Sequence, residues 1–168
     1  MPTKQTTEKA RRAKSEGKAP TTQAGEFVHE EIDRIRHGEH GARSAKQAIA
    51  IGLSKARRAG VDVPAPKKGK TSEKTRKSAE RDLERGHGEA AKHKPSAKRA
   101  RASLRALKRE PTSTVSHDEL SKQAKSAARK RTATERSDAA QKAVRTKGTA
   151  GHSAAARKAA RTRAAHKS

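Results

Sequence analysis

The chain has 168 residues, 43 of them Lys or Arg and 18 Asp or Glu, which gives a formal net charge of +25. It has no Cys, Trp or Tyr, and only 29% of its residues are hydrophobic. This composition excludes a disulfide framework, Cys-based zinc sites and one large packed domain, because so few apolar side chains cannot offset the entropy of ordering the chain. It also implies an anionic partner, of which nucleic acid is the commonest.

Charge and hydrophobicity divide the chain unevenly. Residues 25–66 have a net charge of +1 and hold nine of the sixteen apolar residues larger than Ala. We therefore predict a mostly α-helical protein with extensive disorder, in which a small two-helix motif is flanked by basic, partly helical arms. The predicted segments are a basic disordered arm (1–24), a helical module (25–66), a basic mixed-charge linker (67–95), an amphipathic basic helix (96–110) and an Ala/Lys/Arg-rich, partly helical tail (111–168).

The stretch GEFVHEEIDRIRHG predicts the first helix of the module, at about residues 26–37. Val28, Ile32 and Ile35 follow the i, i+4, i+7 spacing of one helical face, and Phe27 lies beside them. Three carboxylates, at positions 30, 31 and 33, are interpreted as surface ion-pairing groups rather than an acid–base pair.

The stretch SAKQAIAIGLSKARRAGVDVP predicts the second helix, at about residues 45–59. Ser44 and Gln47 form a capping-box pattern, and Gly60 stands at the usual stop position. Small residues along one flank allow another helix to come close. Ile51 points away from that face, and we expect it to approach Val61 and Val63. The predicted module core is Phe27, Val28, Ile32, Ile35, Ile49, Leu53, Val61 and Val63.

The module is expected to be only marginally stable on its own. Nine large apolar side chains are too few to order some forty residues by burial alone. We therefore expect a homodimer through residues 25–66, or a bound partner, to complete the core.

The basic segments are predicted to contact phosphates. In the predicted helix at 96–110, five cations fall within about 100° of one another, beside a thin apolar stripe; a merely solvated charged face is the alternative. The tail is expected to be disordered when free and helical when its charge is neutralised. The predicted nucleic-acid-binding residues are Lys46, Lys55, Arg57, Arg58, Lys67, Lys68, Lys70, Lys98, Arg101, Arg105, Lys108, Arg109, Arg129, Lys130, Arg131, Arg157, Lys158, Arg161 and Arg163.

Catalytic motifs are missing from the sequence. No phosphate-binding GxxxxGK[ST] or GxGxxG loop is present. His37 and His40, with Glu39 between them, cluster in RHGEHG. As a metal site the cluster lacks a clear third and fourth ligand. We therefore predict no enzyme activity, no cofactor, no metal and no small-molecule substrate. The N-terminal residues lack the apolar core of a secretory signal peptide, and no apolar run is long enough to cross a bilayer. We therefore expect a cytoplasmic, nucleoid-associated protein without membrane contact.

The nucleic-acid target is expected to be double-stranded DNA, bound largely without sequence preference. Single-strand binders stack bases on aromatic side chains, whereas this chain has only Phe27. Two alternatives stay open. In one, the protein is an adaptor whose 25–66 module binds a specific protein partner; in the other, it binds RNA or ribosomes.

The run GEFVHEEIDRIRHGEHGARSAKQAIAIGLSKARRAGVDVPAPKKG resembles a family of small, very basic bacterial proteins with the motif S-x-KQAIAIGLS-x-ARRAG. Members are uncharacterised or are labelled DNA-binding or plasmid-stabilisation proteins. The later stretches SLRALKRE and SKQAKSAARKR are similar to members with long basic tails, and the Ala/Lys/Arg-rich end is similar to histone H1-like tails. The resemblance implies DNA association and no catalytic activity.

Overall fold

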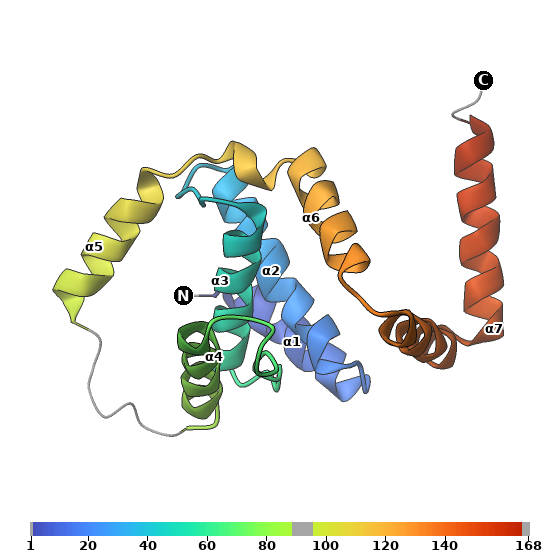
Figure 1. Cartoon of the computed structure of the whole chain (residues 1–168), viewed down its shortest axis with the longest axis horizontal. Coiled ribbons are helices and arrows are strands. Elements are labelled where there is room, and N and C mark those ends of the chain that lie inside the picture. Colours follow the sequence, from blue (N-terminus) through green and yellow to red (C-terminus); the bar gives the residue numbers. More distant parts are fainter. Residues whose placement is uncertain (1, 89–95, 166–168) are drawn as a thin grey trace. The chain divides into compact units, whose positions relative to one another are not determined.

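The computed structural model describes residues 2–88 and 96–165. This described part is helical and contains no strand, which confirms the predicted mostly α class. The helices are α1 (Lys4–Ser15), α2 (Pro20–Arg36), α3 (Ala45–Arg58), α4 (Glu73–Gly86), α5 (Ala97–Lys108), the short 3-10 helix η1 (Ser113–Val115), α6 (His117–Arg129) and α7 (Ala133–Ala165) (Figure 1). The extensive disorder expected from composition is not confirmed, since helices cover most of both predicted arms.

The chain divides into two units, Met1–Gln123 and Ala124–Ser168, and the boundary falls inside α6. The second unit contains the end of α6 and all of α7. A backbone break at Gly148, with φ of 66°, splits α7 into two helical pieces. Among the described side chains of the second unit none is buried, so its helices have no core of their own.

The ends of α3 are set by local sequence. The Ser44 hydroxyl accepts the Gln47 backbone N–H at 3.2 Å, as the capping pattern predicts. The Gln47 side chain reaches back one residue further than a capping box requires, since its Oε1 accepts the Arg43 N–H at 2.7 Å. At the other end Gly60 has φ of +85°, a value that favours glycine.

The centre of the first unit is the antiparallel pair α2 and α3. The small-residue flank of α3 makes the contact: Ala45, Ala48, Gly52 and Ala56 are buried. A Cβ on Gly52 would lie 2.7 Å from Val28 Cα, so the two backbones touch where glycine allows it. The expected role of Ile49 and Leu53 as the main contact is therefore replaced by the smaller residues beside them, and both larger side chains are only half-buried.

The core consists of two small clusters. One contains Phe27, Val61 and Val63 with small residues from three helices, and Leu53 packs against it. The other joins Ile35 and Ile32 to Ala42, Ala48 and Val115. Of the predicted core, Phe27, Ile35, Val61 and Val63 are buried, whereas Val28, Ile32, Ile49 and Leu53 are half-buried.

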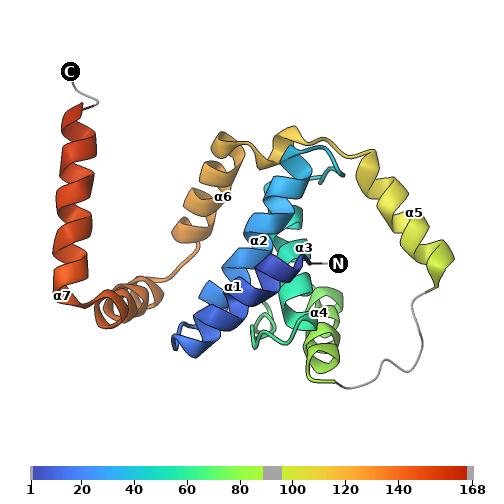
Figure 2. The same cartoon turned by 180° about the vertical axis from the view of Figure 1, so that it is seen from behind.

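Helix α1 covers α2, as Figure 2 shows from behind, and it corrects the expectation of a disordered arm over 1–24. Ala10 is 4% exposed and belongs to the cluster around Phe27. The Thr3 side chain caps α1, and the Thr3 backbone N–H donates to Glu30 Oε1 of α2 at 3.1 Å. The core residue that α1 contributes is thus an alanine, which does not stand out as hydrophobic in the sequence.

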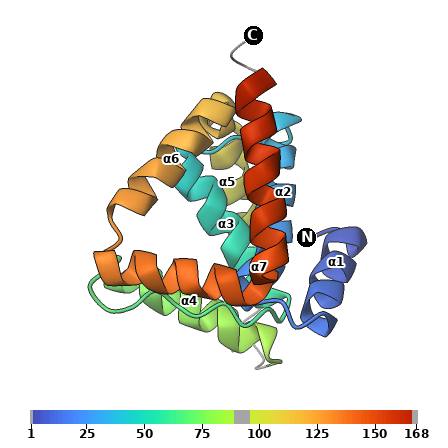
Figure 3. The same cartoon turned by 90° about the vertical axis from the view of Figure 1, so that its right-hand side faces the viewer.

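Helix α4 covers the C-terminal end of α3, so the predicted 67–95 linker is wrong for residues 73–86 (Figure 3). Ala79 is buried in this contact, and Asp82 accepts the Ser54 hydroxyl of α3 at 2.5 Å. Close approach again depends on glycine, because a Cβ on Gly86 would lie 1.9 Å from the Arg57 carbonyl oxygen. The part of the predicted linker over 89–95 lies outside the described residues.

These contacts do not confirm an isolated two-helix motif. The pair α2–α3 is flanked by α1 on one side and α4 on the other, and residues 111–115 complete its second cluster through Val115. The chain itself thus adds core residues on both sides of the pair, and a homodimer through residues 25–66 stays a prediction. None of the described helices is both long and apolar enough to cross a membrane.

Candidate nucleic-acid interface

Helix α5 is the most uniformly basic element of the first unit. Residues 97–108 contain five Lys or Arg and no Asp or Glu. None of the twelve residues of α5, all of which the structure describes, is buried. The predicted face made of Lys98, Arg101, Arg105, Lys108 and Arg109 is therefore exposed to solvent; four of these cations lie in α5, and Arg109 directly follows its last residue.

Most of the other predicted contact residues are also exposed. In the first unit these are Lys46 near the start of α3, Arg58 at its end, and the cations of the loop before α4, Lys67, Lys68 and Lys70. In the second unit they are Arg129, Lys130, Arg131, Arg157, Lys158, Arg161 and Arg163. The structure brings five of these nineteen cations onto one face, that of α5, and distributes the rest over both units.

Two predicted contact residues have internal tasks instead. Lys55 forms an ion pair with the fully buried Glu31 of α2. Arg57 is 7% exposed, and its guanidinium donates to the carbonyl oxygens of Val63 at 3.0 Å and Pro64 at 3.1 Å. Burial lowers the pKa of Arg57 from its usual value, and the Asp82 carboxylate opposes that shift. We remove both residues from the candidate interface, because their charges are engaged inside the fold.

Residues 107–115 attach α5 to the module through main-chain hydrogen bonds. The backbone N–H of Gly41 donates to the Leu107 carbonyl at 2.9 Å, and that of Ala42 donates to the Pro111 carbonyl at 3.1 Å. The Thr114 hydroxyl donates to the Ala42 carbonyl at 2.9 Å. We call residues 107–115 the strap.

The strap ends in a buried anchor. Val115 is 0% exposed and packs in the cluster that contains Ile35, while Arg36 donates to its carbonyl oxygen at 3.2 Å. The fit is tight, since a Cβ on Gly41 would lie 1.8 Å from the Glu110 carbonyl oxygen. Sequence reasoning missed this attachment because Val115 is a single apolar residue between polar ones, and no local sequence pattern indicates which residues it packs against.

A groove of 510 Å³ lies between α2, α3 and the end of α5. Its walls include the apolar residues Ile51, Leu104 and Leu107. Ile51 therefore does not approach Val61 and Val63 as expected, but turns to the side where α5 ends. Lys108 also lines the groove, whereas the other cations of the basic face of α5 are not among its lining residues.

Glu31, Lys55 and His40 are among the residues that line the groove. Glu31 is 0% exposed, so the expectation of a surface carboxylate at position 31 is wrong. Lys55 contacts one of its oxygens, and His40 Nε2 lies 3.3 Å from the other, Oε1. Among the described residues, Glu31 Oε1 has no hydrogen-bond partner. His40 Nδ1 is 3.0 Å from the Gly41 carbonyl, at the point where the strap is attached.

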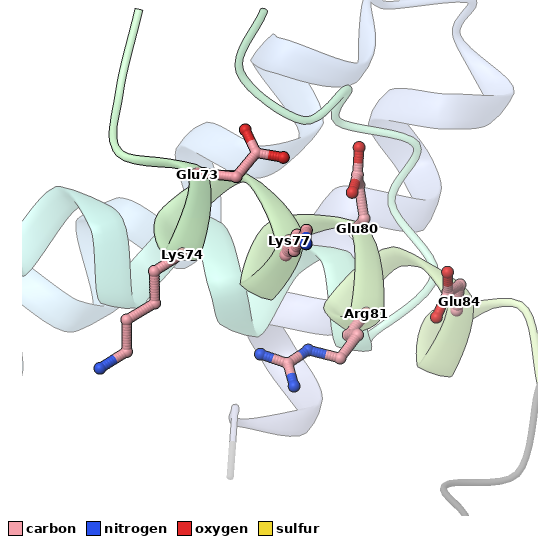
Figure 4. Close-up of a pocket in the computed structure, with 6 residues that line it drawn as sticks. All are labelled: Glu73, Lys74, Lys77, Glu80, Arg81 and Glu84. Carbon is pink, nitrogen blue, oxygen red and sulfur yellow. The ribbon is translucent and has the colours of Figure 1, made fainter. Parts of the chain in front are cut away.

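Two other hollows have the wrong charge for phosphate. A hollow of 310 Å³ beside α1 and α2 is lined by four carboxylates, of Glu26, Glu30, Asp33 and Glu39, against two cations, Lys9 and Arg34, among other residues. A second hollow, of 540 Å³, is shown in Figure 4, and all its lining residues come from α4: Glu73, Lys74, Lys77, Glu80, Arg81 and Glu84. Equal numbers of acidic and basic groups in the second, and an acidic surface in the first, offer no uniform field for a polyanion.

Within residues 2–88 and 96–165 no group of three or more His, Asp or Glu side chains could hold a metal ion. The His37, Glu39 and His40 cluster is used otherwise: His37 Nδ1 lies 2.7 Å from the Asp33 carbonyl oxygen, and Glu39 lies near Arg34 at 3.8 Å. These contacts close the turn after α2.

Comparison with known proteins adds one match. Residues 11–68 match a family described as a family of unknown function (DUF6496). The matched range covers the last five residues of α1, all of α2 and α3, and most of the loop that follows α3. No curated protein and no solved structure matches the chain. The strap, α5, α6 and α7 lie outside the family match.

Proposed function

We propose that this protein is a non-enzymatic, histone-like protein that binds double-stranded DNA largely without sequence preference, by neutralising phosphates. The observation that supports this most is α5, a helix with five cations, no carboxylate and no buried residue among its twelve described positions. Such a face suits phosphate contacts, which need charge but no shaped pocket.

The second unit adds charge without a core. Residues 124–168 contain 13 Lys or Arg and 2 Asp or Glu, a net charge of +11. In our proposal this segment is a disordered arm in the free protein, and it forms the helices of α6 and α7 when phosphates neutralise its charge. The location that follows from this proposal is a bacterial nucleoid or plasmid in the cytoplasm.

Duplex DNA is preferred over single strands for a structural reason. The one aromatic side chain, Phe27, is 1% exposed and lies in the core. The protein thus has no aromatic platform on which unpaired bases could stack. Competition between duplex DNA and structured RNA separates the proposed target from RNA or ribosomes.

A salt series tests the proposal. Fluorescence anisotropy with several unrelated duplexes should give similar affinities, and the logarithm of the binding constant should fall linearly with that of salt. About ten phosphate contacts correspond to a slope near −9. No binding at low salt, or tight binding that persists at several hundred millimolar salt, would contradict the mechanism.

A protein adaptor is the second candidate, and the groove beneath α5 favours it. Its apolar wall of Ile51, Leu104 and Leu107, with Leu104 46% exposed, could receive a partner side chain. A chain that ends at Gln123 discriminates, because it keeps the groove and lacks the second unit. An adaptor would keep its partner after this truncation, whereas the DNA binder would lose much of its affinity.

A further inference from the structure

We infer that α5 binds DNA as a docked helix held on the folded module by the strap, and not as part of a flexible arm. The inference rests on the proposed function, and it assigns the first-contact surface of that function to one element. It also assigns a positioning role to Gly41, Thr114 and Val115, none of which would touch DNA.

The first step is the rigidity of the attachment. Two main-chain hydrogen bonds join residues 41 and 42 to Leu107 and Pro111, at 2.9 and 3.1 Å. They lie one turn or less from Lys108 and Arg109, the last two cations of the basic face. A main-chain hydrogen bond at each of these points fixes the end of the helix more firmly than side-chain contacts would, because no side-chain torsion lies between the two backbones.

The second step is that the attachment is built into the module's core. Val115 is 0% exposed in the same cluster as Ile35 and Ala48, residues of α2 and α3. Arg36 of α2 donates to the Val115 carbonyl through both Nε and Nη2, at 3.3 and 3.2 Å. Releasing the strap would therefore expose a core side chain, so the docked state is the stable one.

The third step is the direction of the basic face. Leu104 and Leu107 line the groove against Ile51 and Lys55 of α3. The cations that adjoin this apolar stripe are consequently exposed. A docked helix presents them without the ordering cost that a free arm meets on binding. The cations of α5 thus contribute more affinity each than those of the second unit.

The experiment uncouples α5 from the module without changing any charge. In the double variant Gly41→Ala, Thr114→Val the new Cβ would lie 1.8 Å from Glu110 O, and the hydrogen bond from Thr114 to Ala42 is removed. Gly25→Ala is the matched control, since its Cβ would meet nothing within 4 Å. We expect the double variant of the full chain to bind a duplex roughly tenfold more weakly, and the control to bind as the wild type does.

A double-mutant cycle separates docking from general destabilisation. Arg101→Gln, Arg105→Gln removes two exposed cations of α5, and is measured in the wild-type and in the undocked background. We expect a clearly larger decrease in affinity in the wild-type background. Equal decreases in both backgrounds would show that α5 acts as a free arm and would overturn the inference, while DNA binding itself would stand. No DNA binding by the wild type would instead refute the proposed function.

Hydrogen exchange keeps the inference testable if the double variant fails to fold. In the wild-type protein the backbone amides of Gly41 and Ala42 should be protected, because each donates to a strap carbonyl. Exchange of both amides at the rate of an unfolded chain, while the amides within α3 stay protected, would show that the strap is not docked in solution and would end the proposal.

Discussion

At the scale of single residues, the protein uses charge in two opposite ways. Most of the cations that the structure describes are exposed, but Lys55 and Arg57 form contacts inside the fold. Lys55 neutralises Glu31, a carboxylate with 0% exposure, and so holds α3 to α2. A buried charge without its partner is strongly unfavourable, which makes this pair a sensitive point of the module.

Lys55→Met should destabilise the protein by about 3 to 5 kcal/mol, because it leaves the Glu31 carboxylate buried without the ammonium group that contacts it. Urea unfolding followed by circular dichroism at the helical band measures the change. Lys46→Met, at an exposed position of the same helix, is the control and should change stability by less than about 0.5 kcal/mol. Equal stability of the two variants would show that the pair is not needed.

Gly52→Ala should also destabilise the module, by about 1 to 3 kcal/mol, because its Cβ would approach Val28 Cα to 2.7 Å and backbone cannot move aside. Gly25→Ala in α2 has open space around it and should instead stabilise by about 0.5 to 1 kcal/mol through helix propensity. Thermal unfolding of the two variants should therefore move in opposite directions from the wild type. A rise in melting temperature for both would mean that α2 and α3 do not pack through Gly52.

At the scale of elements, the flanking helices matter most. The pair α2–α3 has few large side chains, and it is stabilised by α1, α4 and the strap, each of which contributes one or two small apolar residues. Polar contacts add to this. In the α3–α4 contact, Asp82 accepts from Ser54 at 2.5 Å and lies 3.7 Å from Arg58. The module thus depends on segments beyond its most hydrophobic stretch.

Asp82→Ala should loosen α4 from α3 at a cost of about 1.5 to 3 kcal/mol, the usual range for hydrogen bonds to charged groups. Amide exchange should become faster within α4 and stay slow within α2. Glu84→Ala, on the exposed face of α4, serves as the control and should leave exchange unchanged. Slow exchange of α4 in both variants would show that Asp82 is dispensable for docking.

At the scale of the whole molecule, buried side chains are confined to one part of the chain, whereas positive charge is spread over both units. The first unit holds every buried side chain among the described residues, and the second unit carries a net charge of +11. The two proposed tasks, presenting α5 and collecting further phosphates, fall on different units and can be removed one at a time.

Ending the chain at Gln123 should leave the melting temperature of the first unit nearly unchanged, since none of the described side chains that are removed is buried. The salt dependence of DNA binding should become shallower by roughly 0.9 for each phosphate that the shortened chain no longer neutralises. Anisotropy titrations of the full and shortened chains across the same salt range give both slopes. Identical slopes would show that the second unit does not contact DNA.

The limits of sequence reasoning show at particular residues. The periodicity of Val28, Ile32 and Ile35 predicts α2, and the Ser44 cap predicts the start of α3, because both signals are local. The burial of Ala10 and Val115 has no such signal. Alanine is small enough to lie on either a buried or an exposed face of a helix. A single valine in a polar segment can be recognised as a core residue only when the cluster in which it packs is known.

The amino-acid sequence by itself determined the helical class, the two central helices and the excess of positive charge, since helix periodicity, capping and net charge depend on neighbouring residues or on composition alone. Only the tertiary structure decided which helices close the core, which cations are exposed, and that Glu31 is buried. It also placed the strap on Gly41 and Ala42. These features join residues 24 to 79 positions apart, and no local pattern specifies such contacts.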